Sequence, residues 1–178
     1  IQVVGYPGIK QRRNGPKLEE NGKEIDGEGL YLLPGFIDMH GHIGRRSQGA
    51  DPDYVFKLWI SHGITTIRQP SGLNTELILS LKKESAKNSI IAPRIYAYNG
   101  FGSGANIQTE KDAREWVREN AKKGFDGIKF FGDRPEIMKA ALDENKKLGL
   151  RSACHHAQMR VVEWNVLNSA RAGLTSME

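Results

Sequence analysis

The chain has 178 residues, and 26 lysines and arginines against 21 aspartates and glutamates give it a formal net charge of +5. Apolar residues make up 38% of it, which excludes disordered and collagen-like classes. No apolar run approaches the roughly 18 residues of a membrane-spanning helix, so we expect no membrane partner. Basic residues are interspersed with acidic ones, as in Lys82-Lys83-Glu84, which indicates solvated helix surfaces and no nucleic-acid partner. A single cysteine, Cys154, excludes an internal disulfide.

Residues 1–34 differ in composition from the rest of the chain. They are rich in Gly, Lys, Glu and Asn, and Asn14-Gly15 and Asn21-Gly22 are typical of tight turns. We expect a small β element that ends at Pro34-Gly35. The remaining residues, 35–178, are expected to form a second domain.

From Phe36 onward one unit repeats: a short apolar run, a loop, and an amphipathic stretch that stops at glycine. The runs recur at intervals of about 23 to 33 residues, the period of βα units. Their starts lie near Phe36, Ile64, Arg94, Gly127, Leu150 and Leu174. Helices are expected between Asp51 and Gly63, Thr109 and Gly124, Pro135 and Gly149, and Val161 and Gly173. The pattern predicts an α/β fold with a parallel sheet.

Six such strands allow two architectures. An open doubly wound sheet would be complete at this length, whereas a (β/α)8 TIM barrel of about 250 residues would have only its first five to six units here. Length favours the open sheet. A doubly wound nucleotide-binding domain is disfavoured, however, because the glycine-rich segment 100–104 follows the third run and does not match the phosphate-binding pattern.

Candidate metal ligands follow several of the expected strands. His40 and His42 are two residues apart after the first run, so strand alternation directs both imidazoles to one side, with Gly41 between them. Lys129 alternates with Ile128 and Phe130, which places it opposite the helix-facing side. A lysine there must find a partner or lose its charge.

A further histidine follows the fifth run, where His155 and His156 are adjacent. Taken singly, each of these residues could also be an ordinary surface histidine or an ion-paired lysine. His62 is expected to cap a helix end. Strand ends converge on one rim in a barrel but spread along an edge in an open sheet, so the set favours the barrel.

Five segments resemble the amidohydrolase superfamily of metal-dependent hydrolases, with imidazolonepropionase-like and Xaa-Pro-dipeptidase-like members as the nearest in pattern. Residues 34–42 resemble the metal motif of the first strand, and residues 63–68 resemble the second strand. Residues 124–129 are similar to the strand that supplies a carboxylated lysine, and residues 148–155 to the one ending in a metal histidine. Residues 173–178 resemble the approach to a strand-six histidine. The resemblance implies that residues 1–34 are part of a small β-sandwich.

The same resemblance implies a site with two divalent metal ions, most simply zinc. His40 and His42 would hold one ion, His155 would serve the other, and carboxylated Lys129 would bridge them. The ungapped match favours His155 over His156, which stays open. Arg68, Tyr98 and Asn99 are expected on the same rim, in contact with substrate. The implied reaction is hydrolysis of a C–N bond in a small amide, such as a dipeptide or cyclic amide, by a metal-bound hydroxide.

Alternatives stay open at this point. A mononuclear deaminase on the same barrel would use His40, His42 and His155 and leave Lys129 without a metal role. A non-catalytic barrel fragment is the other alternative. We expect these 178 residues alone to be inactive and to require the remainder of their own chain, because a strand-six histidine and a strand-eight aspartate have no counterpart here. The oligomeric state, including a homo-oligomer, and the cellular compartment are left open.

Overall fold

A computed structural model of the chain describes residues 22–23, 25–44, 50–157 and 161–178. The chain divides into two units, Ile1–Pro34 and Gly35–Glu178, and each is considered by itself. The described residues of the first unit contain a turn and no strand. The predicted Asn14-Gly15 turn, and Asn21 of the second predicted turn, lie outside the described residues. Membership of residues 1–34 in a small β-sandwich therefore stays a prediction.

The second unit alternates strands and helices along its length. Its strands are β1 (Phe36–Asp38), β2 (Ile64–Gln69), β3 (Arg94–Gly100), β4 (Gly127–Phe130), β5 (Arg151–Cys154) and β6 (Ser176–Met177). Its helices are α1 (Pro52–Ser61), α2 (Thr75–Ala86), α3 (Glu110–Lys123), α4 (Pro135–Lys147) and α5 (Val166–Arg171). The strands begin at or within two residues of the predicted apolar runs.

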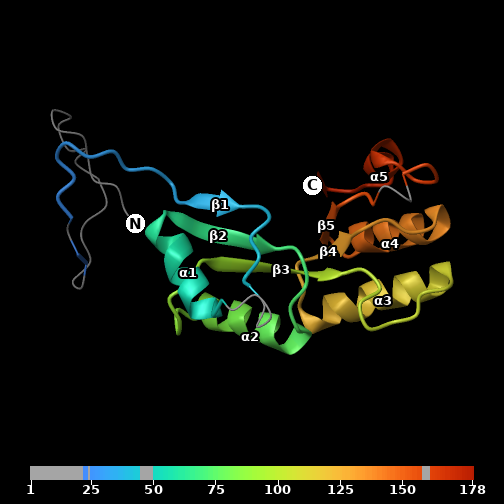
Figure 1. The fold of residues 1–178 in the computed structure, drawn as a ribbon, viewed down its shortest axis with the longest axis horizontal. Helices are drawn as coiled ribbons and strands as arrows, with labels where there is room; N and C mark the ends of the chain where they lie inside the picture. Colours follow the sequence, from blue (N-terminus) through green and yellow to red (C-terminus); the bar gives the residue numbers. More distant parts are fainter. Residues whose placement is uncertain (1–21, 24, 45–49, 158–160) are drawn as a thin grey trace, which may run out of the picture. The chain divides into compact units, whose positions relative to one another are not determined.

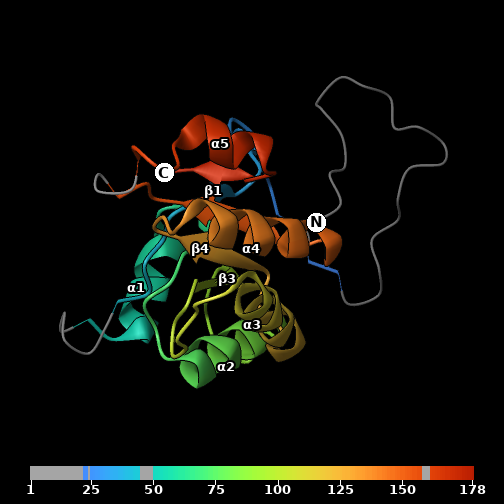
Figure 2. The same ribbon diagram turned by 90° about the vertical axis from the view of Figure 1, so that its right-hand side faces the viewer.

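The strands form one sheet in the order β1-β2-β3-β4-β5-β6, and every neighbouring pair is parallel. A doubly wound sheet reverses its strand order at a switch point, and this sheet does not. Figures 1 and 2 show the strands curling, with α1 to α4 following one another along their outer side. The fold is therefore a partial (β/α) barrel, which confirms the barrel prediction over the open sheet.

Local sequence signals account for the helix ends. Asp51 caps α1 by accepting a hydrogen bond from the Asp53 amide at 2.8 Å, with Pro52 at the first helical position. Thr109 and Asp112 form a reciprocal capping box at the start of α3, as predicted. Gly124 ends α3 with a φ of 95°, a conformation that favours glycine.

The predicted helix between Val161 and Gly173 is shorter than expected. Asn165 and Asn168 make their own capping box, so α5 begins at Val166. Val161 and Val162 lie in the turn before it, and Val162 is 92% exposed, so the valines do not form the predicted apolar stripe. In the described part of the chain, no helix combines the length and apolar character needed to cross a membrane.

The hydrophobic core lies between the strands and the helices in two clusters. Ile67, Ile95 and Phe56 centre one cluster, which involves β2, β3 and α1. Ile128 and Phe130 of β4 belong to the other, with residues of α3 and α4. Because Ile128 and Phe130 pack toward the helices, Lys129 between them lies on the opposite, inner face of the sheet, as alternation predicted.

Candidate active site

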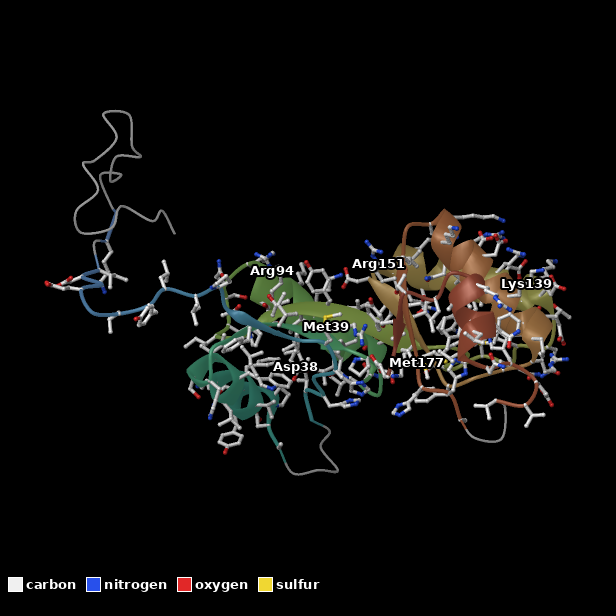
Figure 3. The ribbon with its side chains drawn as sticks, turned by 90° about the horizontal axis from the view of Figure 1, so that it is seen from above. Asp38, Met39, Arg94, Lys139, Arg151 and Met177 are labelled. Carbon is white, nitrogen blue, oxygen red and sulfur yellow. The ribbon has the colours of Figure 1, made fainter. Side chains whose placement is uncertain are left out.

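His40 and His42 lie just beyond β1 and face one another. The two Nε2 atoms are 3.1 Å apart. Strand β1 ends at Asp38, earlier than expected, and the Asp38 carboxylate accepts a hydrogen bond from the His40 amide at 2.9 Å. Figure 3 shows Asp38 and Met39 where the strand ends. The imidazoles nevertheless converge because the Gly41 amide still donates to the Arg68 carbonyl of β2 at 3.1 Å, which continues the strand pairing through the pair.

Gly41 is required between the two histidines by close packing. A Cβ there would lie 3.1 Å from the Trp59 ring of α1 and 3.3 Å from the Asp38 carboxylate. Both contacts are tighter than ordinary van der Waals packing, so a larger residue would require Trp59 or Asp38 to shift by a few tenths of an ångström.

Lys129 lies on the inner face of β4 and is 1% exposed. Its Nζ forms an ion pair with the carboxylate of Glu178 and lies 5.6 Å from the centre of the Phe131 ring. Burying a charge is costly unless it is paired. The ion pair with Glu178 therefore gives the buried lysine the partner that the sequence predicted it would need.

Glu178 is a central residue of the site that the sequence reading did not assign. Its side chain is 8% exposed, and Oε2 lies 2.7 Å from His40 Nδ1 and contacts Lys129. Its other oxygen pairs with Arg68. Two features of the sequence could have indicated Glu178: strand alternation at β6, and the need of Lys129 for an anionic partner. The partners are distant in sequence, with Arg68 110 residues away.

Arg68 and Tyr98 form the neighbouring part of the inner face. The Arg68 guanidinium lies 5.2 Å from the centre of the Tyr98 ring, and its NH1 donates to Ser176 Oγ at 2.7 Å. Burial raises the pKa of the Tyr98 phenol, against the opposing effect of Arg68, so the phenol stays protonated at neutral pH. Two of the three residues predicted to contact substrate, Arg68 and Tyr98, thus lie together beside Glu178.

Asn99 alternates to the other face of β3. Its amide donates to Asn120 Oδ1 of α3 at 2.6 Å, which engages this side chain with the helix layer. A substrate contact by Asn99 stays a prediction, and the structure does not group it with Arg68 and Tyr98.

His155 lies beside the pair at the end of β5. Its ring centre is 6.1 Å from that of His40, and its amide donates to the Phe130 carbonyl at 2.9 Å, which extends the pairing with β4. The ring nitrogens of His156, by contrast, are buried and have no hydrogen-bond partner among the residues that the structure describes. The fold thus brings the His155 ring near His40, and the choice between His155 and His156 as a metal ligand stays a prediction.

The surroundings of His40 lower its pKa, which favours the neutral ring. Burial is the largest cause that lowers the pKa of His40, followed by the neighbouring His42, Arg68 and His155, while Asp38 opposes the shift. A neutral imidazole offers a lone pair, which is the form that binds metal ions.

The histidine pair has the geometry of half a metal site. Two nitrogens bound to one tetrahedral zinc at about 2.0–2.1 Å stand roughly 3.3 Å apart, close to the 3.1 Å between the two Nε2 atoms. Among the described residues, no three His, Cys, Asp or Glu side chains are gathered so as to hold a metal ion. His40 and His42 therefore fit as two ligands of such a site. Lys129 is linked to His40 through the Glu178 carboxylate, which both contact.

Comparisons with known proteins point to one superfamily. Adenine deaminase 2 from Desulfotalea psychrophila is 32% identical over 125 residues, which cover 65% of this chain and 21% of that protein. A dihydroorotase from Geobacter metallireducens is 25% identical over 179 residues, covering 93% of this chain and 40% of that protein. The chain thus spans about a fifth and two fifths of these relatives' lengths. No protein-family model matches it.

A solved structure shares the fold. The crystal structure of a Xaa-Pro dipeptidase with bound methionine aligns with a TM-score of 0.58 at 21% identity, covering 82% of this chain and 47% of that one. The sequence relatives fit the amidohydrolase superfamily that the motifs of this chain resemble, and the solved structure shares the fold.

Proposed function

We propose that the full-length protein is a metal-dependent hydrolase that cleaves a C–N bond in a small substrate. The observation that supports the proposal is that His40 and His42 face one another, the His155 ring lies 6.1 Å from His40, and buried Lys129 and His40 both contact the Glu178 carboxylate. In barrels of this kind the reactive groups gather at that face. The hydrolase class is shared with the relatives named adenine deaminase and dihydroorotase.

Each residue has a role in this proposal. His40 and His42 would bind one divalent ion through their facing Nε2 atoms, and His155 would contribute to a second. Lys129, as a carbamate, would present two oxygens where an ammonium would repel cations. A divalent ion, most simply zinc, supplies Lewis acidity and lowers the pKa of a water molecule. Arg68 and Tyr98 would line the substrate side of the cluster.

The substrate class proposed first is a small amide, either a cyclic amide or a dipeptide. The names of two of the similar proteins, dihydroorotase and Xaa-Pro dipeptidase, agree with this class. Deamination is the second candidate, because three of the four curated relatives are named adenine deaminase, at 32% to 49% identity over their matched segments. Lys129 discriminates between the two, since a one-metal deaminase would leave it without a metal role.

The test combines metal content with product analysis. The full-length protein is purified with zinc and bicarbonate, and bound metal is counted by mass spectrometry. It is then assayed with dihydroorotate, Xaa-Pro dipeptides and adenine. Two zinc ions per chain, together with hydrolysis of the dihydroorotate ring or of the dipeptide without release of ammonia, support amide hydrolysis. One zinc ion and release of ammonia from adenine support the deaminase.

Two variants relate the outcome to the proposed ligands. His42→Ala should abolish turnover and release at least one metal ion, and Lys129→Ala should reduce the count from two to one. Glu119→Gln, on the exposed surface of α3, is the matched control that should change neither quantity. A protein that binds no metal, or that keeps both ions in Lys129→Ala, contradicts the proposed bridging role.

A further inference from the structure

Gln69 is a buried polar residue at the end of β2 that has no role in the site described above. It is 1% exposed. Strand alternation places its side chain on the opposite face from Arg68, on the helix-facing side where Ile67 belongs to the core. A side-chain amide is costly to bury unless both of its ends are hydrogen-bonded. The partners of this amide therefore indicate what Gln69 holds in place.

Both ends of the Gln69 amide bind backbone groups of neighbouring segments. Oε1 accepts a hydrogen bond from the Ile43 amide at 2.7 Å, and Nε2 donates to the Ser71 carbonyl at 2.6 Å. The chemistry of the partners fixes which end of the side chain faces which segment, because a backbone N–H only donates and a carbonyl only accepts. One side chain thus links the segment after β1 to the segment after β2.

The bond to Ile43 holds the chain directly after His42. On the other side of this histidine, the Gly41 amide donates to the Arg68 carbonyl at 3.1 Å. Gly41 and Ile43 are both buried, whereas His42 between them is exposed. Two consecutive residues of β2, one through its backbone and one through its side chain, therefore hold the two amides that flank His42.

The packing of Ile43 makes the contact with Gln69 hard to replace. Ile43 is 0% exposed and belongs to the core cluster that includes Phe56 and Ile67. A buried N–H that loses its acceptor is left unsatisfied unless the chain moves. Movement of this segment would change the placement of the His42 ring, whose Nε2 lies 3.1 Å from that of His40.

We propose that Gln69 is a positioning residue that fixes the backbone after His42 and so keeps the His42 imidazole facing His40. In this role Gln69 acts through the Ile43 amide and contacts neither substrate nor a metal ion. The fixing of the backbone stands on the hydrogen bonds alone, whereas its consequence for zinc binding rests on the function proposed above.

The experiment compares Gln69→Met and Gln69→Glu in the full-length protein. Methionine has a similar length but offers no strong acceptor, whereas glutamate keeps an oxygen for the Ile43 amide. In Gln69→Met we expect faster site-resolved hydrogen exchange at Ile43 in the metal-free protein, and a zinc affinity about tenfold or more weaker by chelator competition. Gln69→Glu should lie closer to the wild type in both measurements.

Ser85→Ala is the matched control. The Ser85 hydroxyl donates to the Pro93 carbonyl at 2.7 Å, so the variant also removes a buried bond between a side chain and the backbone, but at the end of α2. We expect it to lower stability while leaving zinc affinity and Ile43 exchange as in the wild type. Unchanged exchange at Ile43 in Gln69→Met, or a loss of zinc affinity no larger than in Ser85→Ala, would overturn the inference.

Gln69→Asn covers the case in which Gln69→Met does not fold. Its amide is one methylene shorter and cannot span Ile43 and Ser71 together, so we expect the same two changes at smaller size. A folded Gln69→Asn that matches the wild type in both measurements would contradict the role of Gln69. If Ile43 exchange rises in the variants but the wild type binds no zinc, the positioning of the backbone stands and the proposed metal-dependent function fails.

Discussion

Gly127 is a position where the structure predicts a large effect of a single methyl group. Gly127 is the first residue of β4 and lies on the same inner face as Lys129, two residues before it. It pairs in register with Tyr98 and Arg151. A Cβ at Gly127 would lie 2.5 Å from the Arg151 carbonyl oxygen and 2.5 Å from the Tyr98 Cζ atom. Real Cβ contacts are essentially never this short, so something has to move.

The magnitude follows from which atoms are in the way. The Arg151 oxygen belongs to the backbone of a paired strand and cannot rotate aside, while the Tyr98 ring is buried at 6% exposure. Overpacking of a closed core costs about 1–3 kcal/mol, and a backbone obstacle puts Gly127→Ala near the upper limit. A loss of about 3 kcal/mol lowers the melting temperature of a protein of this size by roughly 6–12 °C.

Gly100→Ala is the matched control on the neighbouring strand. Its nearest atom would be the Ser71 Cβ at 3.6 Å, an ordinary contact. Removing a glycine without strain changes stability by about 0.4–1 kcal/mol in the favourable direction. Chemical denaturation of both variants gives the comparison. If Gly127→Ala unfolds within about 0.5 kcal/mol of the wild type, the packing argument at the floor of the site is wrong.

Three further predictions concern the helix side of the barrel. Burial raises the pKa of the Cys154 thiol to about 11, whereas an exposed thiol in the unfolded chain ionises near the ordinary value of about 8.5. The unfolded chain therefore loses this proton first, and the free energy of unfolding falls as pH rises between these two values. Cys154→Ala should flatten this pH dependence in urea titrations. Thr109→Ala removes the cap of α3 and should cost about 1 kcal/mol by thermal unfolding, whereas Lys111→Ala on the exposed face should cost almost nothing. Trp164→Phe loses the 2.6 Å bond from Nε1 to Ser169 Oγ and should cost about 1–3 kcal/mol, and an unchanged denaturation midpoint would contradict the bond.

Much of the fold follows from local signals in the sequence. Apolar runs closed by glycines gave the strand starts, and caps such as Asp51 and Thr109 gave the helix starts, because these depend on residues a few positions apart. The error at α5 has the same local origin. The box formed by Asn165 and Asn168 defines that helix start, and the apolar appearance of the preceding valines concealed it.

The candidate site was predictable only in part, because its partners are distant in sequence. Alternation placed Lys129 on the inner face and predicted that it needs a counter-charge, but only the curling of the sheet brings Glu178 to it. Asn99 and Tyr98 are adjacent in one strand, so alternation alone could have placed them on opposite faces: Asn99 bonds Asn120 of α3, and Tyr98 stacks on Arg68.

The inner face of the sheet couples the packing of the site to its chemistry. The absence of a side chain at Gly127 leaves space for the Tyr98 ring, and the Arg68 guanidinium lies over that ring. Arg68 in turn donates a hydrogen bond to Ser176 and forms an ion pair with Glu178. A displacement of Tyr98 would therefore affect His40 through Arg68 and Glu178, without a direct contact between Tyr98 and His40. The side chains of Ile128 and Phe130 pack instead in the core cluster on the helix-facing side. A substitution of Phe130 should thus reduce stability while leaving the zinc affinity of the folded full-length protein unchanged, whereas Gly127→Ala should lower both together.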